Sequence, residues 1–266
     1  MRLLIVPDLH ENLDFLRYII AVEDSASYDK IVFLGDYFDP PTGVEPDEGR
    51  LREVAGTIIG LKEILGDKLH LLCGNHDLPY YALRPACGAN RGRPNRVLSN
   101  WIGRTSHARA GIVNEVWDEA FWRQLEGPVL LDGCLYSHAG VSPDWWPAEL
   151  ASTGERARWL ARQWRSAFES IFVEAEPTIF AAGKARGGVL PRGGPIWLDF
   201  DHEFEDALEV PQIVGHTRCA RRTPKGRSYC IDFAQAAYAV VEAGEVQLRI
   251  WPESWLGEAV LDDAGA

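Results

Sequence analysis

The chain has 266 residues, 46% of them apolar, ten tryptophans and a formal net charge of −12. This length suits one large α/β domain spanning residues 1–266. The negative charge argues against a general binder of nucleic acid or anionic membranes, so nucleic acid is expected only as a substrate. Five scattered cysteines without a CxxC pair favour a reducing compartment. No apolar run reaches the roughly 18 residues of a membrane helix, and the apolar start is too short for a secretory signal. We therefore expect a cytoplasmic protein that does not enter a membrane.

The first quarter of the chain alternates between strand and helix patterns. Strands are expected at 2–7, 30–34 and 68–73, and helices at 12–26 and 46–65. The first helix places Leu13, Leu16 and Ile19 near one face. Pro40 and Pro41 interrupt the second crossover and predict a loop there. This βαβαβ order predicts parallel strands joined by right-handed crossovers.

An arginine-rich insert is expected at about 78–113. It contains no Asp or Glu, and its prolines and glycines predict an irregular loop. One interpretation is a lid whose guanidinium groups bind phosphate. The other is a solvated basic loop that pairs with acidic surface elsewhere. Its arginines are Arg84, Arg91, Arg93, Arg96, Arg104 and Arg109.

The remaining elements follow in order. Helices are expected at 114–125 and 154–174, and strands at 128–131 and 133–137. The glycine-rich stretch 183–194 is either a second loop at the site or a simple connection. Strands at 212–214, 228–232, 236–242 and 245–250 suggest an antiparallel finishing sheet. The acidic tail at about 252–266 is expected to be peripheral.

Metal-binding residue types follow an apolar strand five times. Ligands of open α/β sheets lie just beyond the carboxyl ends of strands, so these residues are expected to meet. A single such residue is usually structural, but five tips carrying carboxylate, imidazole and amide groups favour a metal site. The five sets are Asp8 with His10, Asp36 with Asp39, Asn75 with His76 and Asp77, His138, and His216.

This series of motifs resembles the calcineurin-like metallophosphoesterase superfamily, whose pattern is DxH, GDxxD, GNH and an acid, a lone His, then GHxH or GHT. The match runs in the same order from Asp8 to Thr217, and residues 229–232 resemble the family's closing strand. The resemblance implies an α/β fold in which two mixed β-sheets form a sandwich flanked by helices. It also places metals at the carboxyl ends of the strands.

The resemblance further implies a metal-dependent hydrolase of phosphate esters with two divalent ions. Mixed oxygen and imidazole ligands suit Mn, Fe or Zn better than Ca, and we expect Mn. His76 matches the catalytic histidine that protonates the leaving group, and Asp39 matches the carboxylate that orients it. The alternative for His76 is a structural role beside the metals. The residues that match the metal ligands are Asp8, His10 and the bridging Asp36 for one ion, and Asp36, Asn75, His138 and His216 for the other.

The chain departs from the family pattern at three positions. Arg218 stands where GHxH has its second histidine, which resembles the branch of serine/threonine protein phosphatases and bacterial dinucleoside-tetraphosphate hydrolases. Pro40 and Pro41 replace the usual Arg-Gly after GDxxD, and Glu11 replaces the glycine after DxH. The phosphate clamp must therefore come from elsewhere. The candidates are Arg84, Arg91 and Arg93 of the insert, and Arg218.

These features favour hydrolysis of a phosphomonoester, on a phosphoprotein or a small phosphorylated substrate. The alternative activity is that of a phosphodiesterase, nuclease or dinucleoside polyphosphate hydrolase, because the basic insert would suit polyanionic substrates. A scaffold that has lost catalysis would be expected to lose ligands or the catalytic histidine. This sequence keeps all six expected ligands together with Asp39 and His76.

Overall fold

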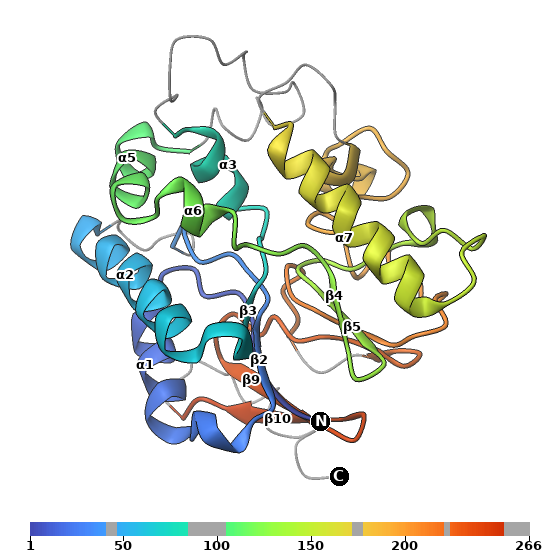
Figure 1. The fold of residues 1–266 in the computed structure, drawn as a ribbon, viewed down its shortest axis with the longest axis horizontal. Coiled ribbons are helices and arrows are strands. Elements are labelled where there is room, and N and C mark those ends of the chain that lie inside the picture. The colour runs from blue at the N-terminus through green and yellow to red at the C-terminus, as the bar shows by residue number, and fades with distance from the viewer. Residues whose placement is uncertain (41–46, 85–104, 172–177, 221–223, 253–266) are drawn as a thin grey trace.

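The computed structural model describes residues 1–40, 47–84, 105–171, 178–220 and 224–252. They form two mixed five-stranded β-sheets flanked by helices, as expected from the sequence (Figure 1). Arg91, Arg93 and the tail after residue 252 lie outside the described residues. Among the described residues, no helix has the length and apolarity required to cross a lipid bilayer.

The first sheet has the strand order β10-β9-β1-β2-β3. Strands β1, β2 and β3, which run from the centre of this sheet to one edge, are parallel, as the βαβαβ pattern predicts. The bounds of its strands are β1 (Arg2–Val6), β2 (Lys30–Phe33), β3 (Leu69–Leu71), β9 (Ala237–Glu242) and β10 (Glu245–Ile250). The hairpin β9–β10 joins this sheet through antiparallel pairing of β9 with β1.

The second sheet has the order β4-β5-β6-β8-β7. Strand β6 is parallel to both of its neighbours, β5 and β8. The expectation of one antiparallel finishing sheet after residue 212 is therefore wrong, because the late strands divide between the two sheets. The bounds are β4 (Val129–Leu131), β5 (Cys134–Ser137), β6 (Gln212–Val214), β7 (Pro224–Lys225) and β8 (Ser228–Cys230).

Strand β1 is buried on both faces, and its side chains alternate between two cores. Leu3 and Ile5 pack between the two sheets, where they meet Tyr136 and Ile213 of the second sheet. Residues that alternate with them, such as Val6, pack under the helices. This period of two explains why the strand is apolar without interruption. Burial on both faces fixes the register of the strand and therefore the position of the residues at its tip.

Helices cover the outer faces of both sheets. Helices α1 and α2 lie against the first sheet, and α7 lies over the second (Figure 1). The helical bounds are α1 (Leu13–Val22), α2 (Glu48–Leu65), α3 (Asp77–Ala82), α5 (His107–Val116), α6 (Glu119–Trp122) and α7 (Thr153–Glu169). Single 3₁₀ turns occur at Ser25–Ser27, Gly66–Lys68, Pro143–Trp145, Thr178–Phe180 and Lys184–Arg186.

The helix expected at 114–125 has the wrong bounds, because α5 and α6 replace it. Ser106 caps the start of α5 by accepting a hydrogen bond from the backbone N–H of Arg109. Asp118 caps α6 by accepting from the N–H of Phe121 at 2.7 Å. Asp bonds more readily to the backbone at a helix start than inside a helix, so the chain restarts at Asp118. The arginine-rich insert thus contributes a helix where a loop was expected.

Two glycines inside α2 offer a simple test of local stability. A Cβ added at Gly56 or Gly60 would meet no atom within 4 Å. Alanine at either position should therefore raise the free energy of unfolding by about 0.5–1 kcal/mol, because glycine is the poorer helix former. Urea denaturation of each variant measures this gain. A loss of stability would mean that α2 packs more tightly there than the structure indicates.

Candidate metal and catalytic site

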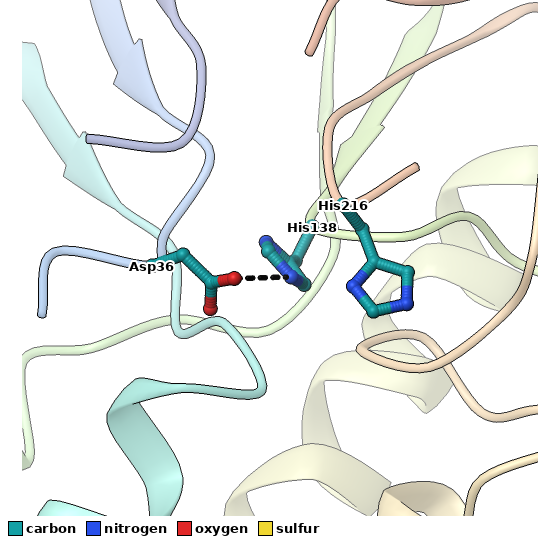
Figure 2. A group of neighbouring side chains, drawn as sticks. All are labelled: Asp36, His138 and His216. Atoms are coloured by element: carbon teal, nitrogen blue, oxygen red, sulfur yellow. Dashed lines mark ion pairs between the residues drawn. The ribbon is translucent and has the colours of Figure 1, made fainter. Parts of the chain in front are cut away.

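The five strand tips meet at one edge, where the two sheets lie against each other. Asp8 and His10 follow β1, Asp36 follows β2, and Asn75 and His76 follow β3. His138 follows β5 and His216 follows β6, so the second sheet supplies the remaining groups. Figure 2 shows Asp36 from the first sheet facing His138 and His216 from the second. Every expected metal ligand lies in this cluster.

Asp36 is shared by two groups of candidate ligands. One group is Asp8, His10 and Asp36, and the other is Asp36, His138 and His216. In each group the ligand atoms lie within 4.8 Å of one another. Nε2 of His138 is 3.5 Å from Oδ2 of Asp36, and Nε2 of His10 is 3.8 Å from the same oxygen. A carboxylate between two ligand sets has the arrangement that a bridged metal pair requires.

Backbone carbonyls orient two of the imidazoles. Nδ1 of His10 lies 2.8 Å from the carbonyl oxygen of Asp39, and Nδ1 of His138 lies 2.9 Å from that of Leu34. A proton on each Nδ1 leaves Nε2 free to bind a metal, which is how ligating histidines are usually held. Oδ1 of Asn75 lies 2.9 Å from Nε2 of His138 and 2.7 Å from Nδ1 of His216. These atoms can therefore converge on one ion.

The site is built from buried carboxylates and neutral imidazoles. Burial raises the pKa values of Asp8 and Asp36 well above the usual range of an aspartate, and neighbouring carboxylates raise them further. Burial also lowers the pKa of His10 to about 4 and that of His138 to about 3. Within the described ranges, the ion-pair contacts of Asp8 and Asp36 are to histidines, and burial keeps those rings neutral. Unpaired buried charge is unfavourable, so divalent cations fit this cluster of ligands.

Metal removal should therefore destabilise the protein. An ion present at about 100 times its Kd adds ~2.7 kcal/mol of stability if it binds only the folded chain. For a chain of this size, chelation should lower Tm by about 5–10 °C. Differential scanning fluorimetry with EDTA, followed by addition of Mn²⁺, measures the change. An unchanged Tm in both steps would argue against a metal site in this cluster.

Asp77 ties the two tips that carry Asp36 and Asn75 together. Its carboxylate accepts hydrogen bonds from the backbone N–H groups of Asp36, Tyr37 and Gly74, each at 2.8 Å. Gly35 lies against Gly74, and a Cβ at Gly35 would be 2.5 Å from the nitrogen of Gly74. The two glycines let the tips pack backbone against backbone. The role of Asp77 in this structure is thus to hold the ligand loops in place.

The backbone is strained at the tips. Five residues without the freedom of glycine have φ between 44° and 68°, which is the left-handed region. Such conformations are unfavourable by about 1–2 kcal/mol per residue and cluster at functional sites. The tight turns aim successive side chains into one small volume. These residues are His10, Glu11, Asp36, Asp39 and His216.

His76 and Asp39 form a pair beside the candidate metal ligands. Nδ1 of His76 is 2.9 Å from Oδ2 of Asp39. Burial pushes the pKa of Asp39 upward, but hydrogen bonds from His76 and Tyr80 outweigh burial and lower it. Asp39 is therefore ionised and can hold a proton on Nδ1 of His76. The His76 side chain is 42% exposed, so its ring can reach a bound ligand.

A cavity of about 230 Å³ opens onto the cluster. Arg186 and Trp197 line it together with the residues of the strand tips. Nε of Arg186 is 2.8 Å from Oδ2 of Asp199, and its Nη2 donates to Oγ1 of Thr217 at 3.0 Å. Asp199 and Thr217 therefore fix this guanidinium at the cavity. The other lining residues are His10, Asp36, Asn75, His76 and His216.

The candidate phosphate-binding arginines lie elsewhere. Arg84 stacks on the ring of Tyr81 at 4.2 Å and pairs with Glu119 at 3.6 Å. Arg218 is exposed and is not among the residues that line the cavity. The sequence identified the glycine-rich stretch 183–194 as a candidate loop at the site, and Arg186 of that stretch does reach the cavity. Sequence alone did not single it out among Lys184, Arg186 and Arg192.

Other residues of the site carried no local signal. Tyr80, Arg109 and Glu11 surround Asp39, and all three come from segments that are distant from it in the sequence. From sequence alone, a tyrosine in a helix is interpreted as a core residue and an arginine as a surface residue, so neither is recognised as part of a site. The unusual Glu11 after DxH, together with Pro40 and Pro41 after Asp39, indicated that this side of the site differs from the family pattern.

Comparisons with known proteins agree with the fold. Residues 1–174 match the family model described as calcineurin-like phosphoesterase. No curated protein matches the chain. A mutant of a cold-active protein tyrosine phosphatase aligns with 94% of this chain and 77% of its own, at 17% identity and a TM-score of 0.61. The cold-active protein-tyrosine phosphatase of a psychrophilic Shewanella species aligns over the same shares, at 16% identity and a TM-score of 0.57. At these identities the similarity concerns the fold.

Proposed function

The chain belongs to the calcineurin-like phosphoesterase family, and from that premise we propose that it hydrolyses phosphomonoesters with two divalent metal ions. The observation that carries the proposal is the pair of ligand groups that share Asp36, beside a cavity that His76 also lines. Mn is the proposed metal, with Fe or Zn as alternatives, because the ligands mix oxygen and imidazole donors.

The proposed ligands divide into two sets. Asp8, His10 and Asp36 would hold one ion. Asp36, Asn75, His138 and His216 would hold the other, so Asp36 belongs to both sets. When bound, such a pair polarises the phosphoryl group and lowers the pKa of a bound water.

His76 acts as the general acid in this proposal. Asp39 holds one proton on Nδ1, at 2.9 Å, so the imidazolium presents its second proton, on Nε2, to the substrate. A proton given to the leaving oxygen avoids the release of a poor alkoxide leaving group, and such transfer contributes about 10²–10⁴ in rate.

Arg186 is proposed as the phosphate clamp, because it lines the cavity while Arg84 is engaged elsewhere. Arg186→Gln should raise KM for a phosphomonoester about tenfold or more, since a hydrogen bond to a charged group is worth ~1.5–3 kcal/mol. Arg192→Gln is the matched control, because Arg192 lies on the same loop but pairs with Glu205 at 3.6 Å. Steady-state kinetics of both variants decide. An equal effect of the two substitutions would contradict a specific role for Arg186.

The function is tested with two model substrates. We expect Mn-dependent hydrolysis of p-nitrophenyl phosphate to exceed that of bis-p-nitrophenyl phosphate. The His76→Ala variant should lose most activity toward an alkyl phosphate, whose leaving group needs a proton. A preference for the diester would favour a phosphodiesterase or nuclease instead. Metal binding without turnover of either ester would argue against a general phosphomonoesterase.

A further inference from the structure

Glu11 stands in a backbone conformation that favours glycine. Its φ is 60°, and its side chain is buried among polar groups rather than exposed. A glutamate there is less favourable than glycine, because its Cβ crowds the neighbouring carbonyl oxygen. Strain of this kind persists only where the surrounding structure enforces it, and it concentrates at functional sites. The contacts of the Glu11 carboxylate show which part of the site this backbone conformation serves.

The carboxylate of Glu11 holds the backbone of Asp39. Its Oε1 accepts a hydrogen bond from the N–H of Asp39 at 2.8 Å. The same oxygen accepts from Nη2 of Arg109, which comes from helix α5. Asp39 has a φ of 64° and lies outside regular secondary structure. A side chain therefore fixes the turn that directs Asp39 toward His76.

Arg109 reaches Asp39 a second time through Tyr80. Nε of Arg109 donates to the hydroxyl of Tyr80 at 3.4 Å, and that hydroxyl donates to Oδ1 of Asp39 at 2.5 Å. The other carboxylate oxygen, Oδ2, remains for Nδ1 of His76. Asp39 is thus held at its backbone, at Oδ1 and at Oδ2. Glu11, Tyr80 and Arg109 are exposed by 2%, 0% and 8%, so water does not compete for these contacts.

The charges of this network are balanced. Arg109 lies against Glu11, so its positive charge compensates that carboxylate. The charge of Asp39 is then available to the imidazole of His76. Removing Arg109 would leave the buried carboxylate of Glu11 without a charged partner, which is strongly unfavourable. The pair Glu11–Arg109 therefore supports Asp39 without adding net charge beside His76.

We propose that Glu11, Tyr80 and Arg109 form a positioning network that fixes Asp39, so that the imidazolium of His76 keeps one proton on Nδ1 and presents its Nε2–H to the leaving group. None of the three is among the residues that line the cavity, so they act through Asp39. The inference rests on the proposed function insofar as His76 is the general acid. The arrangement of the ring, however, can be measured without turnover.

The first test is the dependence of rate on the leaving group. Tyr80→Phe removes one oxygen and keeps the packing of the ring. A misplaced general acid slows esters with poor leaving groups and spares those with good ones. We expect kcat to fall about tenfold or more for an alkyl phosphate and less than about twofold for p-nitrophenyl phosphate. Tyr81→Phe is the matched control on helix α3, because its ring stacks on Phe168 at 4.2 Å.

The second test reads the tautomer of His76 directly. Long-range ¹H–¹⁵N spectra of the zinc-loaded protein, at a pH where the ring is neutral, distinguish Nδ1–H from Nε2–H. Comparison with His76→Ala assigns the signals. In the unmodified chain we expect the Nδ1–H form, and in Tyr80→Phe a shift toward Nε2–H. Unchanged spectra together with an unchanged leaving-group dependence would overturn the proposal.

A charge cycle completes the experiment. Arg109→Met alone should destabilise the fold, and adding Glu11→Gln should recover part of the loss, because the unpaired carboxylate is then gone. Both Arg109→Met and the double variant should show the same shift of His76 toward the Nε2–H tautomer. If Arg109→Met does not fold, Tyr80→Phe carries the test. If the unmodified chain hydrolyses neither model ester, the proposed function fails, while the tautomer measurement still decides the network.

Discussion

Alanine in place of Gly74 is expected to abolish metal binding and to reduce activity at least about 100-fold. A Cβ at this position would overlap Oδ1 of Asp36 and lie 2.5 Å from the backbone nitrogen of Asp36. The proposed bridging carboxylate would have to move, and a displacement of about 1 Å at a reacting centre can reduce the rate 10²-fold. Overpacking of this kind also destabilises the fold by about 1–3 kcal/mol. Metal content by mass spectrometry and esterase kinetics measure the two effects.

Gly56→Ala is the control for this substitution, because it adds the same methyl group in open space. That variant should bind metal and turn over substrate as the unmodified protein does. If Gly74→Ala retained its metal ions, the close approach of the two loop tips would be unnecessary for the site. The role assigned to Gly74 would then be wrong.

Asp36→Asn is expected to lower kcat about 1,000-fold, which corresponds to ~4 kcal/mol of barrier. The amide is nearly the same size, and its oxygen can still accept the hydrogen bond that the N–H of His76 gives to Oδ1 of Asp36 at 2.8 Å. The loop geometry should therefore survive. The lost property is the negative charge between the two proposed ions, whose mutual repulsion it offsets. Kinetics at saturating Mn²⁺, together with metal content, separate weak binding from slow chemistry.

The control for Asp36→Asn is Asp67→Asn, which changes an exposed carboxylate on the connection before β3. Its kinetics and metal content should match those of the unmodified chain. Full activity of Asp36→Asn would show that no bridging carboxylate is needed, and the two-metal proposal would fail. Similar Tm values for the two variants in EDTA would show that any difference arises from the metals.

The α/β class and the grouping of the candidate ligands could be predicted from local features of the sequence. Each of Asp8, Asp36, Asn75, His138 and His216 follows an apolar strand, and such strands place their carboxyl ends at ligand sites. This information is local, because strand character and the residue after the strand lie within a few positions. The period of two in β1 likewise follows from burial on both faces. The sequence therefore located the tips without any knowledge of how they pair.

The pairing of the strands, and the distant side chains that reach the site, became visible only in the folded chain. Hairpin β9–β10 joins β1 rather than the neighbours of β6. The sequence could not show this pairing, because alternation specifies the faces of a strand but not its partner. In the sequence, Arg186 does not differ from the other basic residues of its loop. In the structure, Asp199 and Thr217 hold it at the cavity. In the sequence, Arg109 is one of several arginines in a basic insert. In the structure, helix α5 places it against Glu11. Contacts of this kind leave no pattern in the nearby sequence, because the partner lies well outside the local segment, up to 98 residues away for Arg109 and Glu11.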